Sequence, residues 1–328
     1  MSVLRNIFLR REAGIAVMIV LVVVAVSAYK PHFFNYNSLR IVLLLVPLIM
    51  MVAMGQMMVL VARHVDLSVG SMLGLSAMIT GMMFRDMPEV WWPLGFVVAI
   101  GVGSALGLFN GLLVTVFRLP AIIVTLGTLN LYRGLTFIVS NARQVDRQYI
   151  PSGLKDMSRF SPFLGIPWIV WMALAVAVAT YVFLQHTRVG RQIYALGSNP
   201  DAAPLRGIDA DRVTLLVFTI SGALSGLAGI MYASRWGFVN PSNTGAGFEF
   251  QVIAAVVIGG VSINGGVGTV LGTVLGVLLL GCVSAALPFV GIAGTTQNAI
   301  YGAVILLALI IDRSVRQQGV QGLARMSR

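Results

Sequence analysis

Few side chains in this sequence could carry out covalent chemistry, and none has a catalytic spacing. A phosphate-binding loop of the Walker type needs a lysine directly after a glycine-rich turn, and the only lysines are Lys30 in Tyr-Lys-Pro and Lys155 in Leu-Lys-Asp. The three histidines, His32, His64 and His186, are scattered along the chain and have no metal-ligand spacing. A Gly-x-Ser-x-Gly nucleophile motif is absent. The sequence therefore predicts no enzymatic activity, no metal and no cofactor.

The polar residues inside apolar stretches are mostly neutral amides and hydroxyls, which suit a path for a neutral, polyhydroxylated solute. Proton- and ion-coupled transporters usually carry ionisable residues in their spans, and here the clear one is Arg133. The alternative, that these groups only join helices by hydrogen bonds, stays open for each of them. The candidates for a substrate path are Gln56, Asn110, Thr125, Thr128, Asn130, Arg133 and Gln251.

The composition is that of a membrane protein. Of 328 residues 58% are hydrophobic and only 10% are charged, whereas about a quarter of a soluble domain is charged. The mean hydropathy is +0.91. The net charge of +11 fits cytoplasmic loops and anionic lipid better than nucleic acid, because no basic stripe alternates with aromatic residues. The single cysteine, Cys282, lies in an apolar run and is expected to be a packing residue.

A helix that crosses the bilayer needs about 20 apolar residues. Suitable stretches are 13–29, 41–62, 67–84, 94–117, 120–140, 163–185 and 213–234. Residues 250–311 contain no Asp, Glu, Lys or Arg, and at about 1.5 Å per residue they cover roughly three further spans. We therefore predict an all-α polytopic membrane protein with about ten transmembrane helices, which form one membrane domain over residues 1–328.

The distribution of positive charge sets the expected orientation. With the N-terminus inside, the inner segments carry more Lys and Arg than the outer ones, in the direction of the positive-inside rule. An even number of spans then puts both termini in the cytoplasm. Two loops are long enough to have structure of their own, an outer one at 141–162 and an inner one at about 185–212.

The inner loop contains a segment that predicts a short docking helix. Asp201 is a suitable N-cap, Pro204 is tolerated in the first turn, and Gly207 can end the helix. Such a helix would expose a small apolar surface to the cytoplasm, so we expect it to dock on a partner; a solvated linker is the alternative. The residues of this loop are Gly190, Arg191, Gly197, Asn199, Asp201, Ala202, Ala203, Leu205, Gly207 and Ile208.

Two turns between predicted spans are candidates for gating, although a simple turn or cap explains each equally well. Asp66 precedes a helix rich in small residues and can cap its N-terminus, while Gly70 allows close helix packing. Asn264, Gly265 and Gly266 form a glycine-rich turn farther along the chain. The Gly-Thr-Val-Leu-Gly that follows at 268–272 echoes Gly-Ser-Met-Leu-Gly at 70–74, which raises the hypothesis of an internal repeat.

Four segments in this order resemble the permease subunit of bacterial ABC importers of the monosaccharide (ribose, xylose, rhamnose) class. They are Asp-Leu-Ser-Val-Gly-Ser (66–71), Thr-Leu-Gly-Thr (125–128) with Tyr-Arg-Gly (132–134), Gly-Arg…Tyr-Ala-Leu-Gly-Ser-Asn (190–199) and Gly-Gly-Val-Ser…Gly-Gly-Val-Gly (259–268). The similarity covers nearly the whole chain. The stretches 118–134 and 235–268 look closest to rhamnose and autoinducer-2 permeases, whereas Pro204 departs from the family's loop.

The resemblance implies a division of labour in the bacterial inner membrane. A periplasmic sugar-binding protein would deliver the sugar, and two permease subunits, identical or related, would form the path. Cytoplasmic ATP-binding subunits would hydrolyse ATP and dock on residues 190–208. The runner-up interpretation is an ion-coupled secondary transporter, which would need an ion gradient and no ATPase. A membrane-embedded enzyme is disfavoured, because the sequence shows no catalytic set.

Overall fold

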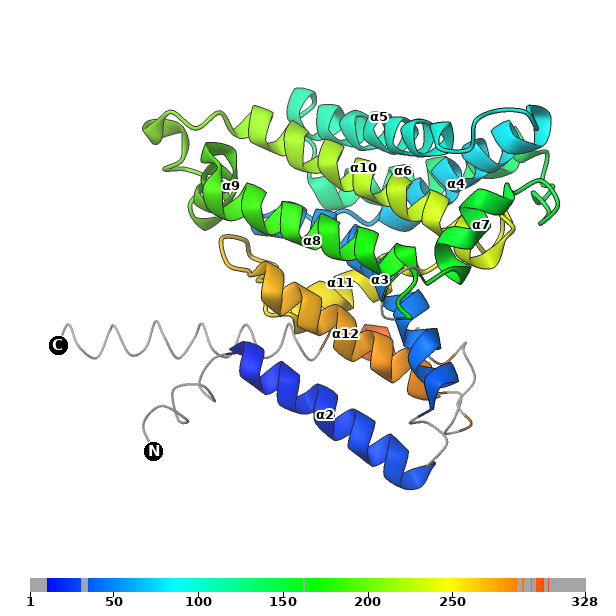
Figure 1. Cartoon of the computed structure of the whole chain (residues 1–328). Helices are drawn as coiled ribbons and strands as arrows, with labels where there is room; N and C mark the ends of the chain where they lie inside the picture. Colours follow the sequence, from blue (N-terminus) through cyan, green and yellow to red (C-terminus); the bar gives the residue numbers. More distant parts are fainter. Residues whose placement is uncertain are drawn as a thin grey trace.

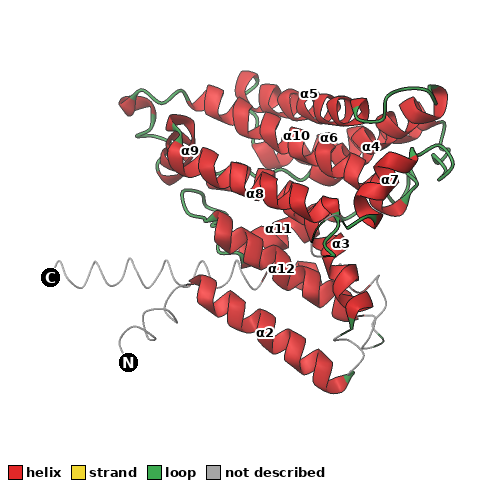
Figure 2. Cartoon of the chain, in the orientation of Figure 1, coloured by secondary structure: helices red, strands yellow, loops and turns green. Residues whose placement is uncertain are grey.

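The chain is helical throughout the part that the structure describes. The computed structural model describes residues 11–30, 35–161, 163, 165–287, 291, 296, 299–303 and 306. Its helices are α2 (Arg11–Tyr29), α3 (Tyr36–Val61), α4 (Val69–Asp86), α5 (Leu94–Val116), α6 (Ala121–Ser140), α7 (Ser152–Arg159), α8 (Trp168–His186), α9 (Arg188–Ser198), the 3₁₀ turn η2 (Pro204–Arg206), α10 (Ala210–Trp236), α11 (Phe248–Ile258) and α12 (Val270–Ala286). Among the described residues, only two isolated β-bridges interrupt this all-α architecture (Figure 2).

Six of the described helices, α2, α3, α5, α6, α8 and α10, are long and apolar enough to cross a membrane. The shorter apolar helices α11 and α12 come from the uncharged stretch 250–311. The prediction of an all-α polytopic membrane protein is confirmed. The last predicted span, beyond residue 287, falls mostly outside the described residues.

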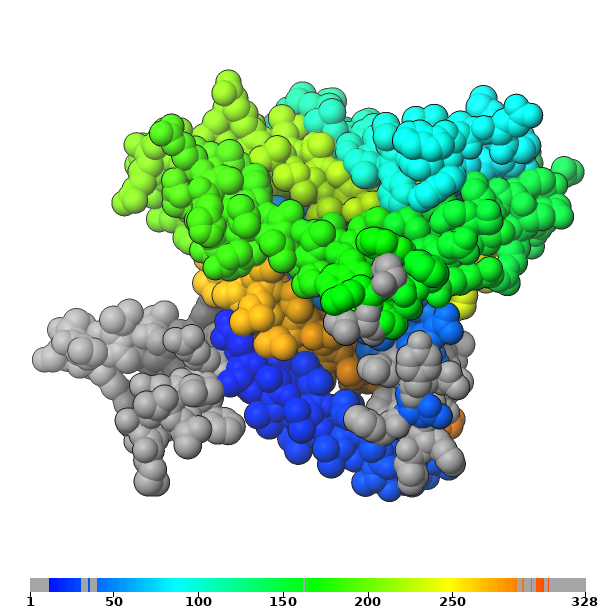
Figure 3. Space-filling model, in the orientation of Figure 1, coloured from blue at the N-terminus to red at the C-terminus, as the bar shows by residue number. Residues whose placement is uncertain are grey.

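The centre of the bundle is α3, whose residues from Leu48 to Ala62 are almost completely buried by the chain itself. In Figure 1, α4, α5, α6 and α10 lie above it, α8 and α9 in front of it, and α11, α12 and α2 below. The space-filling view shows how α8 and α9 cover the front of the bundle (Figure 3). The helices α7 and α9 lie at opposite ends of the bundle.

Glycines bring α5 and α10 into backbone contact. A Cβ on Gly103 would lie 2.2 Å from the carbonyl oxygen of Gly222, and a Cβ on Gly222 would lie 2.1 Å from that of Gly103. Helices in membranes gain little from the hydrophobic effect between them, so close van der Waals packing through small residues holds them together. This close contact fixes the position of α5 relative to α10.

Candidate functional site

The segment 62–68 between α3 and α4 is not helical, yet its residues Asp66 and Ser68 are fully buried. Asp66 Oδ1 accepts hydrogen bonds from the backbone N–H of Ser68 at 2.9 Å and from its hydroxyl at 2.6 Å. The N-cap of α4 is therefore Ser68, and Asp66 stabilises the turn before it. The expectation that Asp66 itself caps the helix was wrong by two residues, because its short side chain reaches the nearest free donors in the turn.

Asn110 connects this turn to α5 and α6. Its Nδ2 donates to Ser68 Oγ at 2.8 Å, and the Tyr132 hydroxyl lies 2.9 Å from Asn110 Oδ1 and 2.9 Å from the carbonyl oxygen of Leu106. Asn110 has no exposed surface. Its amide joins the start of α4, α5 and α6 by hydrogen bonds. Tyr132, which the motif Tyr-Arg-Gly contains, was not among the predicted site residues.

Most other path candidates also lie inside the protein. Thr125 Oγ1 donates to the carbonyl oxygen of Ala121 at 2.9 Å and lies 3.3 Å from that of Val65. Gln251 Nε2 donates to the Tyr301 hydroxyl at 3.0 Å. Thr128 and Gln56 are buried as well, and the Gln56 amide has no hydrogen-bond partner within the described residues.

Asn130 is the exception, because it is exposed on the outer face of α6. Its Nδ2 donates to the carbonyl oxygen of Leu126 at 3.0 Å, within the same helix. The neighbouring Gly127 and Gly134 face open space, since a Cβ on either would meet nothing within 4 Å. This strip of α6 therefore combines an amide with two positions where another surface can approach closely.

Arg133 holds a loop against α4. Its Nη1 donates to the carbonyl oxygen of Thr244 at 2.7 Å. The loop 240–247 and the first turn of α11 pack tightly on α4: a Cβ on Gly70 would lie 2.4 Å from the carbonyl oxygen of Gly245 and 2.3 Å from Glu249 Oε2 in α11. Gly70 is thus needed for close approach, as predicted from its type. The loop itself was missed, although Asn-Pro-Ser-Asn-Thr-Gly at 240–245 is rich in turn formers.

Three segments far apart in the sequence meet at one end of the bundle, and we call this contact the α9 junction: residues 61–63, 194–198 and 265–268. The backbone N–H of Gly266 donates to the carbonyl oxygen of Val61 at 2.9 Å, and the Tyr194 hydroxyl donates to that of Gly268 at 2.9 Å. A Cβ on Gly197 would lie 1.7 Å from the carbonyl oxygen of Val61, so α9 can approach only through a glycine.

The glycine-rich turn completes this junction. Gly265 and Gly266 have positive φ angles of 84° and 73°, which L residues with side chains rarely adopt. The backbone N–H of Asn264 lies 3.3 Å from Ser262 Oγ, which tightens the turn. The candidates of this turn therefore shape a backbone that touches both α3 and α9.

The inner loop differs from its predicted form. The residues after α9 form only the 3₁₀ turn Pro204–Arg206, whose N-cap is Ala203. Asn199, which ends α9, accepts a hydrogen bond through its side chain from the backbone N–H of Ala202 at 3.0 Å. The longer helix capped by Asp201 was a wrong prediction, because residues 200–203 form a turn that the Asn199 side chain stabilises. Gly207 ends the turn with a φ of 75°, as expected.

The apolar surface of this loop is smaller than predicted. Ala203 is only 3% exposed, whereas Leu205 is 88% exposed, and Ala202 and Ile208 are half-buried. The prediction that Ala203 faces the cytoplasm was therefore wrong, since the chain turns back on itself after Asn199. Upstream, the Thr187 side chain caps α9 by accepting from the backbone N–H of Gly190 at 3.0 Å, and Arg191 is exposed.

His64, which follows the end of α3, is an ionisable group whose pKa this packing changes. Its Nε2 lies 3.1 Å from Thr214 Oγ1, and its ring contacts Phe218 with centroids 5.8 Å apart. Burial lowers the pKa of His64 to about 4, so the imidazole is neutral at neutral pH. It serves as a packing and hydrogen-bonding group between the α3–α4 turn and α10.

Comparisons with known proteins agree with this geometry. Residues 38–309 match the family described as branched-chain amino acid transport system / permease component. Relatives include the autoinducer 2 import system permease protein LsrC of Salmonella typhi, 35% identical over 93% of this chain and 86% of the relative. LsrC of Klebsiella pneumoniae is 35% identical over 96% and 90%, and that of Photorhabdus laumondii 34% identical over 93% and 90%.

No solved structure matches the chain. The family profile and the relatives each span most of the sequence, and the described helices are those of a multi-pass membrane protein. Family members are permease components, so this chain is not an enzyme and ATP is hydrolysed by a separate subunit. The chain belongs to this family of importer permeases.

Proposed function

We propose that the chain translocates autoinducer-2 or a closely related monosaccharide across the bacterial inner membrane. The observation that carries this proposal is the 35% identity to autoinducer-2 import permeases over 93% of the chain. The neutral character of the exposed polar group on α6, Asn130, supports a solute without net charge. Rhamnose and pentoses are the competing substrates.

The substrate proposal is tested by uptake of radiolabelled sugars in cells that express the chain with its own ATP-binding subunit and binding protein. Autoinducer-2 is expected to accumulate and to be competed by its close analogues. A strain lacking only this chain is the control. Accumulation of rhamnose or ribose without autoinducer-2 would replace the proposed substrate.

The partners are the other components of an ABC importer. The cytoplasmic ATP-binding subunit docks on α9 and on residues 199–209, where Leu205 projects. The periplasmic binding protein docks at the opposite end of the bundle, near α7, and both termini lie in the cytoplasm. The chain pairs with a second permease, and residues 1–328 act as one membrane domain; the hydrophobic core that runs continuously from α3 to α12 supports this last inference.

The outer face of α6 borders the translocation path between the two permease subunits. An amide in contact with lipid is costly unless water or a polar partner satisfies it, and Asn130 is exposed in the middle of a candidate span. Gly127 and Gly134 leave room beside it for a solute or a neighbouring helix. Arg133, one turn further along, fixes the adjacent loop 240–247.

Cysteine labelling tests this path. In a Cys282→Ser background, Asn130→Cys is expected to react with a membrane-impermeant thiol reagent in at least one nucleotide state. Val97→Cys, 66% exposed on α5, is the matched control for a lipid-facing position and is expected to stay unlabelled. If neither Asn130→Cys nor Val97→Cys reacts with the reagent in any nucleotide state, the proposal is refuted. Asn110→Cys, which the chain buries, should react only if the bundle opens.

A further inference from the structure

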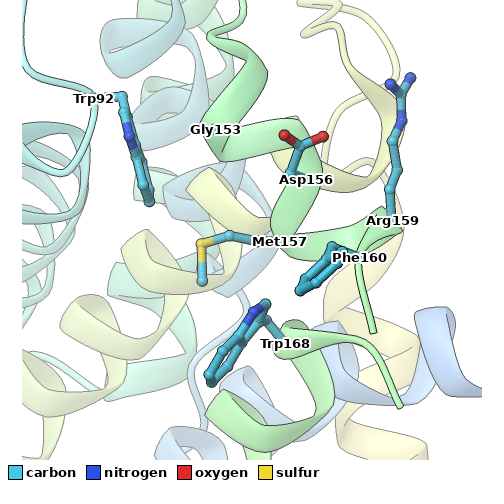
Figure 4. A pocket seen from close by; sticks show the side chains of 7 residues that line it. All are labelled: Trp92, Gly153, Asp156, Met157, Arg159, Phe160 and Trp168. Carbon is cyan, nitrogen blue, oxygen red and sulfur yellow. The ribbon is translucent and has the colours of Figure 1, made fainter. Parts of the chain in front are cut away.

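A cavity of about 600 Å³ lies at the end of the bundle opposite α9, outside the proposed path. Its walls are Trp92, Met157, Phe160 and Trp168, with Asp156 and Arg159 at its edge (Figure 4). Trp92 packs directly on α7, since a Cβ on Gly153 would lie 2.7 Å from its indole nitrogen. The volume falls within the usual range of small-molecule sites, about 300–1,000 Å³.

The position of the two tryptophans places this cavity at a membrane surface. Trp168 is the first residue of α8, and Trp92 stands two residues before α5; both helices are candidate spans. The cavity brings the two helix starts together, so both helices enter the membrane at the same level. Tryptophan is enriched at that level, where its ring contacts the lipid headgroup region.

The short helix α7 has the character of an interfacial helix. Leu154 and Ser158 are buried on one side, while Asp156 and Arg159 are exposed on the other. Such amphipathic helices lie in the plane of the interface. In Figure 4 the side chains of Asp156 and Arg159 extend from α7 in one direction, and those of Met157 and Phe160 extend in the other, towards Trp168.

Asp156 and Arg159 are one turn apart on α7, yet no salt bridge joins them among the described residues, whose ion pairs involve other side chains. A carboxylate and a guanidinium that lie beside an apolar wall match a ligand with a cation, an anion and a hydrocarbon portion. A phosphate accepts hydrogen bonds from a guanidinium, and a primary ammonium donates to a carboxylate. A zwitterionic phospholipid has all three parts.

We propose that this cavity binds one phospholipid of the phosphatidylethanolamine class. Asp156 accepts hydrogen bonds from the ammonium group, and Arg159 donates to the phosphate. Trp92, Met157, Phe160 and Trp168 contact the glycerol and the upper acyl chains. An anionic lipid would place its negative headgroup beside Asp156, and a trimethylammonium group has no N–H to donate to that carboxylate.

Native mass spectrometry of the purified full-length protein, after exchange into vesicles of dioleoyl-phosphatidylethanolamine, -choline or -glycerol, tests the proposal. One phosphatidylethanolamine is expected to stay bound. Asp156→Asn should lower its retention about tenfold, as expected for one charge-assisted hydrogen bond, and should reduce the preference over phosphatidylcholine. Arg159→Gln should lower the retention of both lipids, because both carry the phosphate.

Glu89→Gln and Arg143→Gln are matched controls, because they remove exposed charges that do not line the cavity. They should retain phosphatidylethanolamine like the parent. Equal retention of the three lipids by the parent protein would overturn the proposal, as would unchanged retention in both cavity variants. Loss of binding-protein docking in these variants, with lipid occupancy unchanged, would assign the cavity to a protein partner and contradict a lipid site.

Discussion

Gly197 meets the carbonyl oxygen of Val61 so closely that any side chain must displace one of the two backbones. We predict that Gly197→Ala destabilises the protein by about 1–3 kcal/mol, as overpacking does, and lowers transport per ATP hydrolysed. Thermal unfolding and the ratio of transport to ATP hydrolysis in proteoliposomes measure the two effects. Gly101→Ala on α5 is the control, since its Cβ would meet nothing within 4 Å. If Gly197→Ala keeps the parental ratio of transport to ATP hydrolysis, the α9 junction does not couple ATP hydrolysis to transport.

The Tyr194 hydroxyl offers a milder test of the same junction. Tyr194→Phe removes only its hydrogen bond to the carbonyl oxygen of Gly268, which is worth about 0.5–1.5 kcal/mol. Membrane insertion should be normal, and the transport-to-hydrolysis ratio should fall, because α9 loses a fixed contact with the glycine-rich turn. A fall in melting temperature with an unchanged ratio would reduce this bond to a structural role.

His64 makes stability depend on pH. Its pKa is about 4 in the folded protein and about 6.5 in an unfolded chain, so the unfolded state binds the proton first as pH falls. The contribution of the neutral imidazole is present above pH 6.5 and is lost between about pH 6.5 and 4, with a slope of at most about 1.4 kcal/mol per pH unit. His64→Gln should flatten this part of a melting-temperature profile, and identical profiles would contradict the assignment.

At the scale of elements, the inner loop presents Leu205 rather than a capped helix. Leu205→Glu should insert normally, bind the ATP-binding subunit more weakly and reduce transport, because it places a charge in a small apolar contact. A pull-down of the ATP-binding subunit measures this. Ala203→Glu should instead lower stability, since Ala203 is buried within the chain. Unimpaired docking of Leu205→Glu would place the contact elsewhere.

The sequence was sufficient to predict the long apolar helices, because about 20 uninterrupted apolar residues have few alternatives to a membrane span. It did not predict the short helices α7 and α9, which lie in stretches that it assigned to loops. It could predict a turn before α4 but not the partners of that turn, because Asn110, which donates to Ser68, and Tyr132, which donates to Asn110, come from distant helices. The same holds for Ala203: its burial follows from a three-dimensional turn set by Asn199. Local sequence patterns indicate which residues favour a turn or a helix, but the contacts with distant helices determine the hydrogen-bond partners and the burial of each residue.

For polar residues in spans, the sequence left two alternatives, a place along a substrate path or a hydrogen bond between helices. The burial of each residue in the structure bears on this choice. Asn110 and Asn130 are the same residue type on neighbouring helices, but one is fully buried in a hydrogen-bond network and the other exposed. Helical periodicity alone cannot decide this, because both faces of a span in a multi-pass protein are apolar. Only the packing of α5 on α10 and of α6 on α4 distinguishes the inner face from the outer one.

At the scale of the whole molecule, the central claim is that ATP hydrolysis by a separate subunit drives transport through this chain. The direct measurement is solute uptake into proteoliposomes that contain the chain, its second permease, the ATP-binding subunit and the binding protein. Uptake is predicted to require ATP and all components, and to persist when ionophores abolish proton and sodium gradients. Uptake driven by an ion gradient without ATP or the ATP-binding subunit would contradict the account and favour a secondary transporter.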